Sequence, residues 1–174
     1  MRTPSRGARA TVLVLALLAC NDGLHPVPAP TTCPQHFTGI CGHVTFAGAI
    51  PDSTDAVYIV AYHTFPRSRD SLFTFQPGIA FLQALPLDSA ATFYSVGLPT
   101  GRYEWVVAVW KKLGTLTTAS ADSLLREAGF YRDPADTTLP GVVNVYTQGT
   151  DSIDFVIDFA HMHPPCRYYN PPCP

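Results

Sequence analysis

The chain has 174 residues, of which 47% are hydrophobic and 14% are charged, and its formal net charge is −2. This apolar content excludes a disordered chain, and so few charges exclude a long solvated helix or a coiled coil. The charge balance leaves no basic surface of the kind that binds nucleic acid. The length is that of one ordinary domain.

The first 19 residues predict a secretory signal peptide. Three arginines precede the apolar run Thr11–Ala19, which is shorter than the roughly 20 residues of a membrane-spanning helix. The residues that end this run, Leu17-Leu18-Ala19-Cys20, resemble the lipobox of bacterial lipoproteins. The resemblance implies that residues 1–19 are cleaved and that Cys20 carries the lipid. It also implies export to the bacterial cell envelope, with lipid anchoring on the periplasmic or extracellular side of a membrane. The alternative is an ordinary signal peptide cleaved nearby, with no role for Cys20.

Residues 20–40 predict a lipidated cysteine followed by a proline-rich tether. Pro26, Pro28 and Pro30 favour polyproline II, in which the residues from Asn21 to Thr32 extend up to about 35–40 Å. Cleavage of the signal peptide removes three arginines, so 8 basic residues remain against 13 acidic ones, a formal charge of −5. Membrane attachment therefore depends on the lipid rather than on a basic patch.

Four further cysteines, Cys33, Cys41, Cys166 and Cys173, are disulfide candidates, since an even number is expected in an exported chain. They allow three connectivities, which the sequence leaves open. The local pairing, Cys33 with Cys41 and Cys166 with Cys173, closes the smallest loops and is favoured for that reason.

Residues 41–161 predict a mainly β domain, because short β-branched and aromatic runs alternate with Gly, Pro, Asp and Ser clusters. The last run alternates, with Ile153, Phe155, Ile157 and Phe159 on one face, which is typical of an antiparallel sandwich. The predicted strands are His43–Phe46, Ala56–His63, Leu72–Phe75, Ile79–Leu85, Ala91–Val96, Arg102–Lys111, Val142–Tyr146 and Ile153–Phe159.

One short helix is predicted over Ala121–Ala128, where apolar residues recur at helical spacing after a possible cap at Ser120. We expect it to cover the outer face of the two strands that are apolar on both faces, Ala56–His63 and Arg102–Lys111.

Unbroken alternation along Arg102–Lys111 determines which aromatic residues of the central strands face outward. It places Trp105, Val107 and Val109 on the core face with Tyr103, and Trp110 on the outer face. Tyr58 and Tyr62 face outward as well. Such side chains either stack on sugars or anchor a protein partner, or pack under the helix or the C-terminal tail.

Two segments resemble the carboxypeptidase regulatory-like domains, which are transthyretin-like (prealbumin-like) β-sandwiches. The first runs from Gly42-His43-Val44-Thr45-Phe46 through Gly48 and Ile50-Pro51 to Ala56-Val57. The second, Leu98-Pro99-Thr100-Gly101-Arg102-Tyr103, is similar to the family's Leu-Pro-x-Gly-x-Tyr turn. The resemblance implies a transthyretin-like antiparallel β-sandwich of about seven to eight strands, with the helix inserted before the last two. The C-terminal motif of the family's hydrolase of 5-hydroxyisourate has no match in Arg167-Tyr168-Tyr169-Asn170.

The residues best suited to metal binding lie at the start of the Cys- and Pro-rich tail, residues 162–174. His161 and His163, with Cys166 nearby, are the only metal candidates, for copper or zinc, but two imidazoles form an incomplete site and the cysteine is expected to be oxidised. Asp154 and Asp158 share a strand face about 13 Å apart, too far for acid–base catalysis. Asp133 and Asp136 are typical of a turn.

No nucleophile motif, phosphate loop or zinc-protease motif occurs in the sequence, so no catalytic activity and no cofactor are predicted. The expected function is a membrane-anchored, extracytoplasmic, non-catalytic binding or structural module. Its expected partners are the membrane, through the lipid, and an envelope protein or carbohydrate, but not nucleic acid. The alternative is a periplasmic protein that binds a small ligand or a metal through its C-terminal His and Cys residues.

Overall fold

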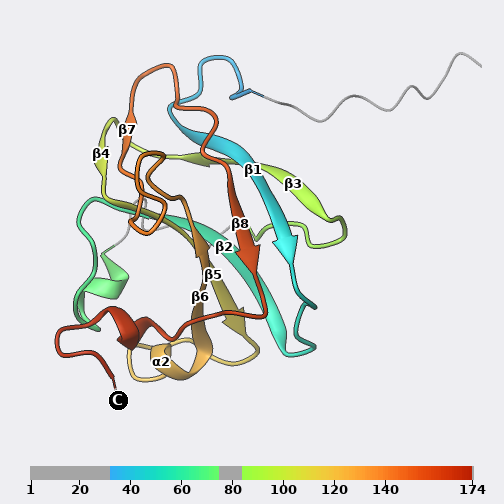
Figure 1. Ribbon diagram of the computed structural model, residues 1–174, viewed down its shortest axis with the longest axis vertical. Coiled ribbons are helices and arrows are strands. Elements are labelled where there is room, and N and C mark those ends of the chain that lie inside the picture. Colours follow the sequence, from blue (N-terminus) through green and yellow to red (C-terminus); the bar gives the residue numbers. More distant parts are fainter. Residues whose placement is uncertain (1–31, 75–83, 174) are drawn as a thin grey trace, which may run out of the picture.

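The computed structural model describes residues 32–74 and 84–173, and over these the fold is mainly β (Figure 1). Two open three-stranded sheets face each other as in a β-sandwich, with strand orders β3-β1-β8 and β2-β5-β6, and β4 and β7 form a separate pair. The strands are β1 (Gly39–Ala47), β2 (Thr54–Tyr62), β3 (Ala91–Gly97), β4 (Gly101–Tyr103), β5 (Trp105–Lys112), β6 (Leu125–Phe130), β7 (Val143–Val145) and β8 (Phe155–Asp158). The helical segments are η1 (Ser71–Phe73), α2 (Ala121–Leu124) and η3 (Pro165–Tyr168).

The core between the sheets is built from the inward face of each strand. Ile40 and Val44 of β1 meet Val57 and Ile59 of β2, while Ile157 of β8 packs in the same cluster. All five side chains are buried, and the alternation predicted for the last strand is confirmed. Burial of one face of each sheet against the other is what makes the two layers a sandwich.

The expectation of a wholly antiparallel sandwich is wrong at one edge. β1 pairs antiparallel with β3 but parallel with β8, with Val44 opposite Phe155. Parallel neighbours require a long connection, and here nearly the whole domain separates the two strands along the chain. Turn residues in the sequence indicate only where neighbouring strands reverse direction, so they do not predict the parallel pairing of β1 with β8.

Two predicted strands differ in the structure. Leu72–Phe75 was expected to be extended, but Ser71–Phe73 forms the 3-10 turn η1, which buries Leu72. Of Ile79–Leu85, residues 79–83 lie outside the described residues. Leu85 donates its amide to the Val57 carbonyl without belonging to a strand.

The predicted helix Ala121–Ala128 is wrong in its second half. Only Ala121–Leu124 is helical, and Leu125–Phe130 is strand β6, paired antiparallel with β5. Ser120 also makes no side-chain cap to the helix. Two isolated helical turns are marginal in water, whereas pairing with a central strand satisfies the backbone and buries Ala128 in the core. The tertiary partner overrides the local spacing.

The face assignment of the tryptophans is also wrong. The strand is interrupted at Glu104: Tyr103 pairs with Val143 of β7, whereas Trp105 pairs with Tyr62 of β2. This break shifts the alternation by one residue, and such a shift exchanges the two faces of everything that follows. Val106, Ala108 and Trp110 therefore lie in the core between the sheets, and Trp105, Val107 and Val109 lie outside it.

A second apolar cluster covers the outer face of the β2-β5-β6 sheet. Tyr62, predicted to face outward, packs there with Trp105 and donates its hydroxyl to the Leu72 carbonyl at 2.6 Å. Its cover comes from η1, α2, β6 and the tail, whose Tyr168 packs against the same cluster. Of the aromatics predicted to face outward, Tyr62 is thus buried and Tyr58 half-buried against other segments, whereas Trp110 lies in the core between the sheets.

The turn at Leu98–Tyr103 is held by its tyrosine. The Tyr103 side chain has no exposed surface, and its hydroxyl donates to the Pro99 carbonyl at 3.0 Å. A buried tyrosine that bonds back to the backbone a few residues upstream fixes the corner where one strand ends and the next begins. The prediction that Tyr103 faces the core is confirmed.

Candidate functional site

Both disulfides join neighbouring cysteines. Cys33 pairs with Cys41 of β1, and Cys166 of η3 pairs with Cys173. Of the three connectivities left open by the sequence, the structure therefore contains the local one. The predicted lipid attachment site, Cys20, lies outside the described residues.

The C-terminal tail folds back onto the sandwich. Its backbone pairs with β6, where the Glu127 amide donates to the His163 carbonyl at 2.7 Å and the His163 amide donates to the Glu127 carbonyl at 2.8 Å. Farther along, the Asn170 amide donates to the Arg67 carbonyl at 2.9 Å. These main-chain bonds make residues 162–173 part of the domain surface, beside the bottom of β6 in Figure 1.

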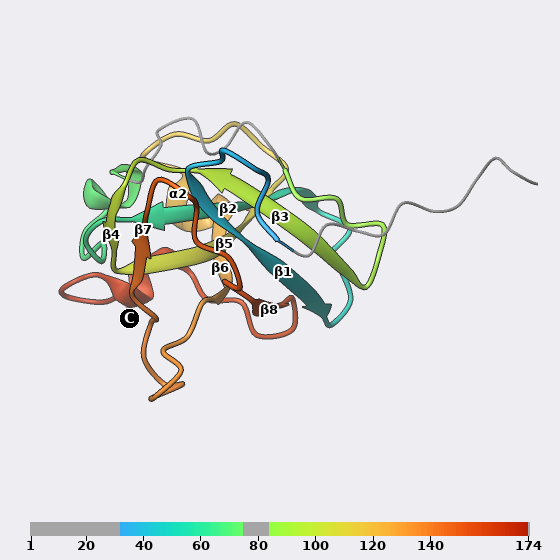
Figure 2. The same ribbon diagram turned by 90° about the horizontal axis from the view of Figure 1, so that it is seen from above.

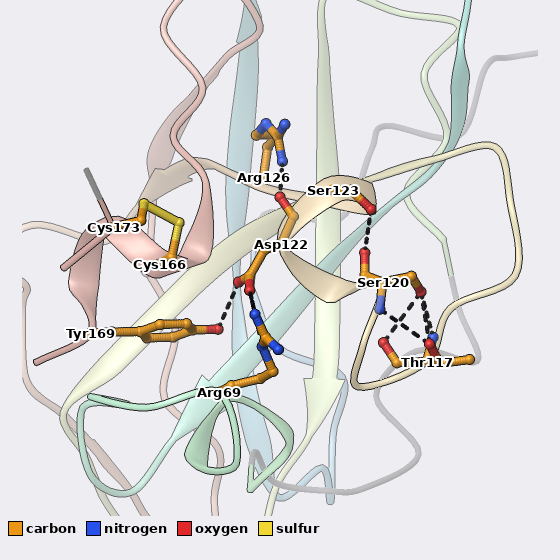
Figure 3. Close-up of polar contacts among 9 residues, drawn as sticks. All are labelled: Arg69, Thr117, Ser120, Asp122, Ser123, Arg126, Cys166, Tyr169 and Cys173. Carbon is orange, nitrogen blue, oxygen red and sulfur yellow. Dashed lines mark hydrogen bonds and ion pairs between the residues drawn. A yellow bond between two sulfur atoms is a disulfide. The ribbon is translucent and has the colours of Figure 1, made fainter. Parts of the chain in front are cut away.

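A polar cluster beside the second disulfide fastens the tail from its other side (Figure 3). Asp122 of α2 forms an ion pair with Arg69 and accepts a hydrogen bond from the Tyr169 hydroxyl at 3.1 Å. Arg126 donates to the Asp122 carbonyl at 2.8 Å. Every charged group drawn in this cluster is occupied within the protein, so we assign it a structural role.

The folded tail forms one wall of a groove of about 1010 Å³, which we call the tail groove. The other walls are β6, the outward side chains of β8, and residues 138–140 of the loop that projects from the sandwich in Figure 2. The size of the groove suits a ligand of several rings. The lining residues include Phe65, Arg67, Glu104, Trp105, Glu127, Gly129, Phe130, Arg132, Leu139, Asp154, Val156, Asp158, His161, His163, Arg167 and Tyr168.

Four aromatic rings gather in the tail groove, each from a different segment. The Trp105 ring centroid lies 4.7 Å from that of Phe65, 5.3 Å from that of Tyr168 and 6.4 Å from that of Phe130. Trp105 is 3% exposed and its Nε1 has no hydrogen-bond partner among residues 32–74 and 84–173, while the other three rings are half-buried. The groove therefore has an aromatic floor, which we define as these four residues.

Each carboxylate of the tail groove is engaged within the protein. Glu104 accepts from Arg102 at 2.6 Å, and Asp158 lies 2.8 Å from His161 Nδ1. Asp154 accepts from the backbone amide of His43 at 2.7 Å. Glu127 accepts from the Tyr168 hydroxyl at 2.6 Å. None of these pairs includes a serine, threonine or cysteine side chain.

Glu127 is the one charged residue that the described chain buries, at 7% exposure. Burial raises the pKa of its carboxyl above the usual glutamate range, and the Tyr168 hydrogen bond opposes this only in part. The buried carboxyl in turn helps to raise the pKa of the Tyr168 hydroxyl, whose main cause is burial. The pair fixes the tail against β6 at the edge of the aromatic floor.

We expect the free energy of unfolding of the wild type to fall as pH rises through the pKa of Glu127, and we expect Glu127→Gln to abolish this fall. Because the pKa of Glu127 is raised in the folded state, the folded protein binds its proton more tightly than the unfolded chain does. Wild-type stability therefore falls as pH increases from the ordinary glutamate range through the folded pKa. Glutamine still accepts from Tyr168, so the free energy of unfolding of the variant should rise relative to wild type over that range.

Glu104→Gln is the matched control for this experiment, with the opposite sign. Arg102 lowers the pKa of Glu104, so the charged form stabilises the fold above the ordinary glutamate pKa and this contribution disappears in acid. Urea unfolding measured from pH 2.5 to pH 8 checks both variants, with the Glu104 effect expected at the acid end of the range and the Glu127 effect above the ordinary glutamate pKa. If the difference in free energy of unfolding between Glu127→Gln and wild type did not change with pH across this range, the raised pKa of Glu127 would be contradicted.

The metal candidates are placed apart from further ligands. His161 pairs with Asp158, and His163 lies 2.8 Å from Nη1 of Arg167, a cation that opposes metal binding. Cys166 is in a disulfide. Within residues 32–74 and 84–173, no three His, Cys, Asp or Glu side chains lie close enough together to hold a metal ion.

The two aspartates expected in a turn are found in one. Asp133 Oδ1 accepts from the amides of Ala135 and Asp136, at 2.7 and 3.3 Å, and Asp136 Oδ1 accepts from the Thr138 amide at 3.0 Å. These side-chain caps shape the loop that ends at the tail groove.

The sequence pattern does not indicate the central residues of the tail groove. Glu127 lies in Ala121–Ala128, which is predicted as a helix, Arg132 lies in the predicted turn of Asp133 and Asp136, and Tyr168 lies in the tail, which is predicted as a separate segment. One feature of the sequence does single out Glu127. It is the only acid in the run Leu125–Phe130, and if this run is a half-buried strand, the carboxyl is buried, which is rare for a glutamate without a partner.

Comparison with known proteins finds no matching family model, no matching curated protein and no matching solved structure. None of the helices in the described part of the chain is long and apolar enough to cross a membrane.

Proposed function

We propose that this chain is an exported, lipid-anchored envelope protein whose β-sandwich is a non-catalytic binding module that holds its ligand in the tail groove. The observation that carries this proposal is the groove itself. It is large, has an aromatic floor, and has four carboxylates that are each occupied within the protein. Aromatic floors with convergent polar groups are typical of ligand sites.

The anchor in this proposal is the lipid on Cys20, at the end of the signal peptide of residues 1–19. The lipobox-like Leu17-Leu18-Ala19-Cys20 supports it, and so does the local pairing of the four other cysteines, which leaves only Cys20 without a disulfide role. Residues 21–31 would then separate the domain from the membrane.

We assign the sandwich, within the same proposal, to the transthyretin-like type. The corner at Pro99 and Tyr103 supports it, as does Gly42 of β1, where a Cβ would lie 2.3 Å from the Ile153 carbonyl oxygen. The parallel β1–β8 pair and the short α2 followed by β6 describe how this chain builds it.

Cys20→Ala is expected to abolish acyl labelling and to release the protein from the membrane fraction. The matched control is His25→Ala, which alters the tether and keeps Cys20, and it should retain both label and membrane attachment. Metabolic labelling with a fatty-acid probe and membrane sedimentation measure the two properties. Continued labelling and sedimentation of Cys20→Ala would show that the anchor is wrong.

A photo-crosslinking residue at Leu139 should capture a ligand or partner in intact cells, whereas the same residue at Leu113 should not. Both leucines are exposed, at 53% and 58%, but only Leu139 lines the tail groove. Crosslinked products are compared by mass shift. Equal products at both positions would contradict the assignment of the tail groove as the binding site.

A further inference from the structure

Three arginines line the tail groove without a carboxylate partner. Within the described residues, no carboxylate oxygen lies within 4 Å of the guanidinium groups of Arg67, Arg132 or Arg167. Elsewhere on the domain the basic side chains that pair with acids are Arg69, Arg102 and Lys111. Arg132 donates to the Thr137 carbonyl at 2.8 Å and Arg167 contacts the His163 ring at 2.8 Å, but neither partner is a carboxylate. In a chain with more acidic than basic residues, three guanidinium groups without a carboxylate partner at one groove are a concentration of positive charge.

The acids of the tail groove offset this charge only in part, and the exposed Asp154, which accepts from the neutral backbone amide of His43, is the one that keeps its charge there. Glu104 is neutralised by Arg102, and Asp158 is engaged by His161. Glu127 is buried, and its raised pKa weakens its tendency to ionise. The groove therefore presents guanidinium donors to an incoming ligand, and guanidinium groups bind carboxylates through paired hydrogen bonds.

The arginines stand beside the aromatic floor. The Arg132 guanidinium carbon lies 4.5 Å from the Phe130 ring centroid, and the Arg67 guanidinium carbon lies 5.6 Å from that of Phe65. Arg132 and Arg167 both act electrostatically on the Tyr168 hydroxyl. A ligand that reaches these cations must therefore also lie against half-buried rings, whose faces pack on apolar ring surfaces.

At the groove, the edge of β6 is paired at Glu127, and the outer edge of β8 is closely approached by Gly129. The main chain of Glu127 is bonded to that of His163, and Gly129 lies so close to Val156 that a Cβ would approach its carbonyl oxygen to 2.1 Å. An extended peptide recognised by a sheet needs a free edge for its backbone. The groove can therefore contact a ligand mainly through side chains. This favours a ligand whose own rings and charged substituents are recognised over an extended peptide bound by backbone hydrogen bonds.

We infer that the tail groove binds an acidic saccharide, in which sugar rings pack on the aromatic floor and a ring carboxylate is held by Arg132 and its neighbouring arginines. The inference rests on the proposed binding function and names the ligand class for the same site. The groove volume of about 1010 Å³ accommodates several sugar rings.

The test is isothermal titration of the full chain, purified in detergent, with three matched probes: an oligogalacturonate, the neutral galacto-oligosaccharide of the same length, and an oligoglutamate peptide of similar charge. The acidic sugar should bind about tenfold or more tightly than either of the others. Raised salt should weaken its binding, since the arginines are exposed.

Arg132→Gln and Arg67→Gln should each weaken oligogalacturonate binding by about tenfold. Lys112→Gln is the matched control, because Lys112 is an exposed cation outside the groove and its loss should leave the affinity unchanged. Thermal melting of each variant shows whether it is folded. The two arginine positions lie in different segments, so a folding defect in one variant leaves the other as a test.

Equal binding of the neutral and acidic sugars would overturn the inference and leave the groove as a neutral saccharide site. Preference for the peptide would overturn it in favour of an acidic protein partner. Absence of oligogalacturonate binding would also overturn it, while the proposed function is judged separately by crosslinking at Leu139 and by acyl labelling of Cys20.

Discussion

Gly129→Ala is expected to lower the free energy of unfolding by more than about 3 kcal/mol, because strands β6 and β8 leave no room for a side chain between them. A Cβ at this position would lie 2.1 Å from the Val156 carbonyl oxygen and 3.1 Å from its carbonyl carbon. Both are backbone atoms of β8, which cannot move aside as a side chain would.

The position of Gly129 in the fold prevents relaxation. It pairs with Ala108 of the central strand β5 on one side and meets β8 of the opposite sheet on the other. A shift that relieves the clash must break one of these contacts. Because Gly129 and Val156 both line the tail groove, we expect the variant to lose binding along with stability.

Gly97→Ala provides the control for this prediction. Gly97 is also a strand glycine, in β3, but the nearest atom to its Cβ position is the Thr38 carbonyl oxygen at 3.9 Å, an ordinary contact. Its substitution should change the free energy of unfolding by less than about 1 kcal/mol. Urea unfolding followed by tryptophan fluorescence compares the two, and similar midpoints would show that β6 and β8 do not approach as described.

Trp110→Ala should cost about 3–5 kcal/mol of stability, because it empties a site in the core between the sheets. Trp110 is 5% exposed and packs in the cluster that both sheets share. Its Nε1 also donates to Thr54 Oγ1 at 2.7 Å, a bond that the substitution removes.

The phenylalanine variants separate the two tryptophans. Trp110→Phe keeps an aromatic ring but loses the bond to Thr54, which should cost about 1 kcal/mol beyond the loss of ring area. Trp105→Phe should lose no hydrogen bond, since Trp105 Nε1 has no partner in the described part of the chain. Calorimetric melting of the four Ala and Phe variants measures this. A Trp110→Ala protein as stable as wild type would contradict the placement of Trp110 between the sheets.

The structure of the C-terminal tail depends partly on its own sequence and partly on distant residues. Its proline and cysteine content correctly indicated a short disulfide loop, since a bridge over few residues closes easily. The same composition suggested a separate segment, yet His163 pairs with Glu127 and Tyr168 packs on Trp105. Those partners lie about 40 and 60 residues away in sequence. No pattern within the tail encodes them.

The sequence by itself determined the features that depend on neighbouring residues. These are the β character of most of the runs, the alternation of the last strand and the turn that ends at Tyr103. Each follows from backbone preferences or side-chain parity over a few positions, and these act before any distant contact forms. For the cysteines, short loops favoured the local disulfides among three possible connectivities.

Only the tertiary structure decided which strand Leu125–Phe130 would become, which face Trp105 would take, and that β8 would lie parallel to β1. It alone brought Arg67, Arg132 and Arg167 to one groove. The physical reason is the same in each case. A local pattern indicates how much apolar surface a segment must bury, but the partner that buries it comes from elsewhere in the chain. That partner can turn a weakly helical segment into a strand, and a break at a single residue such as Glu104 can exchange the two faces of the strand that follows.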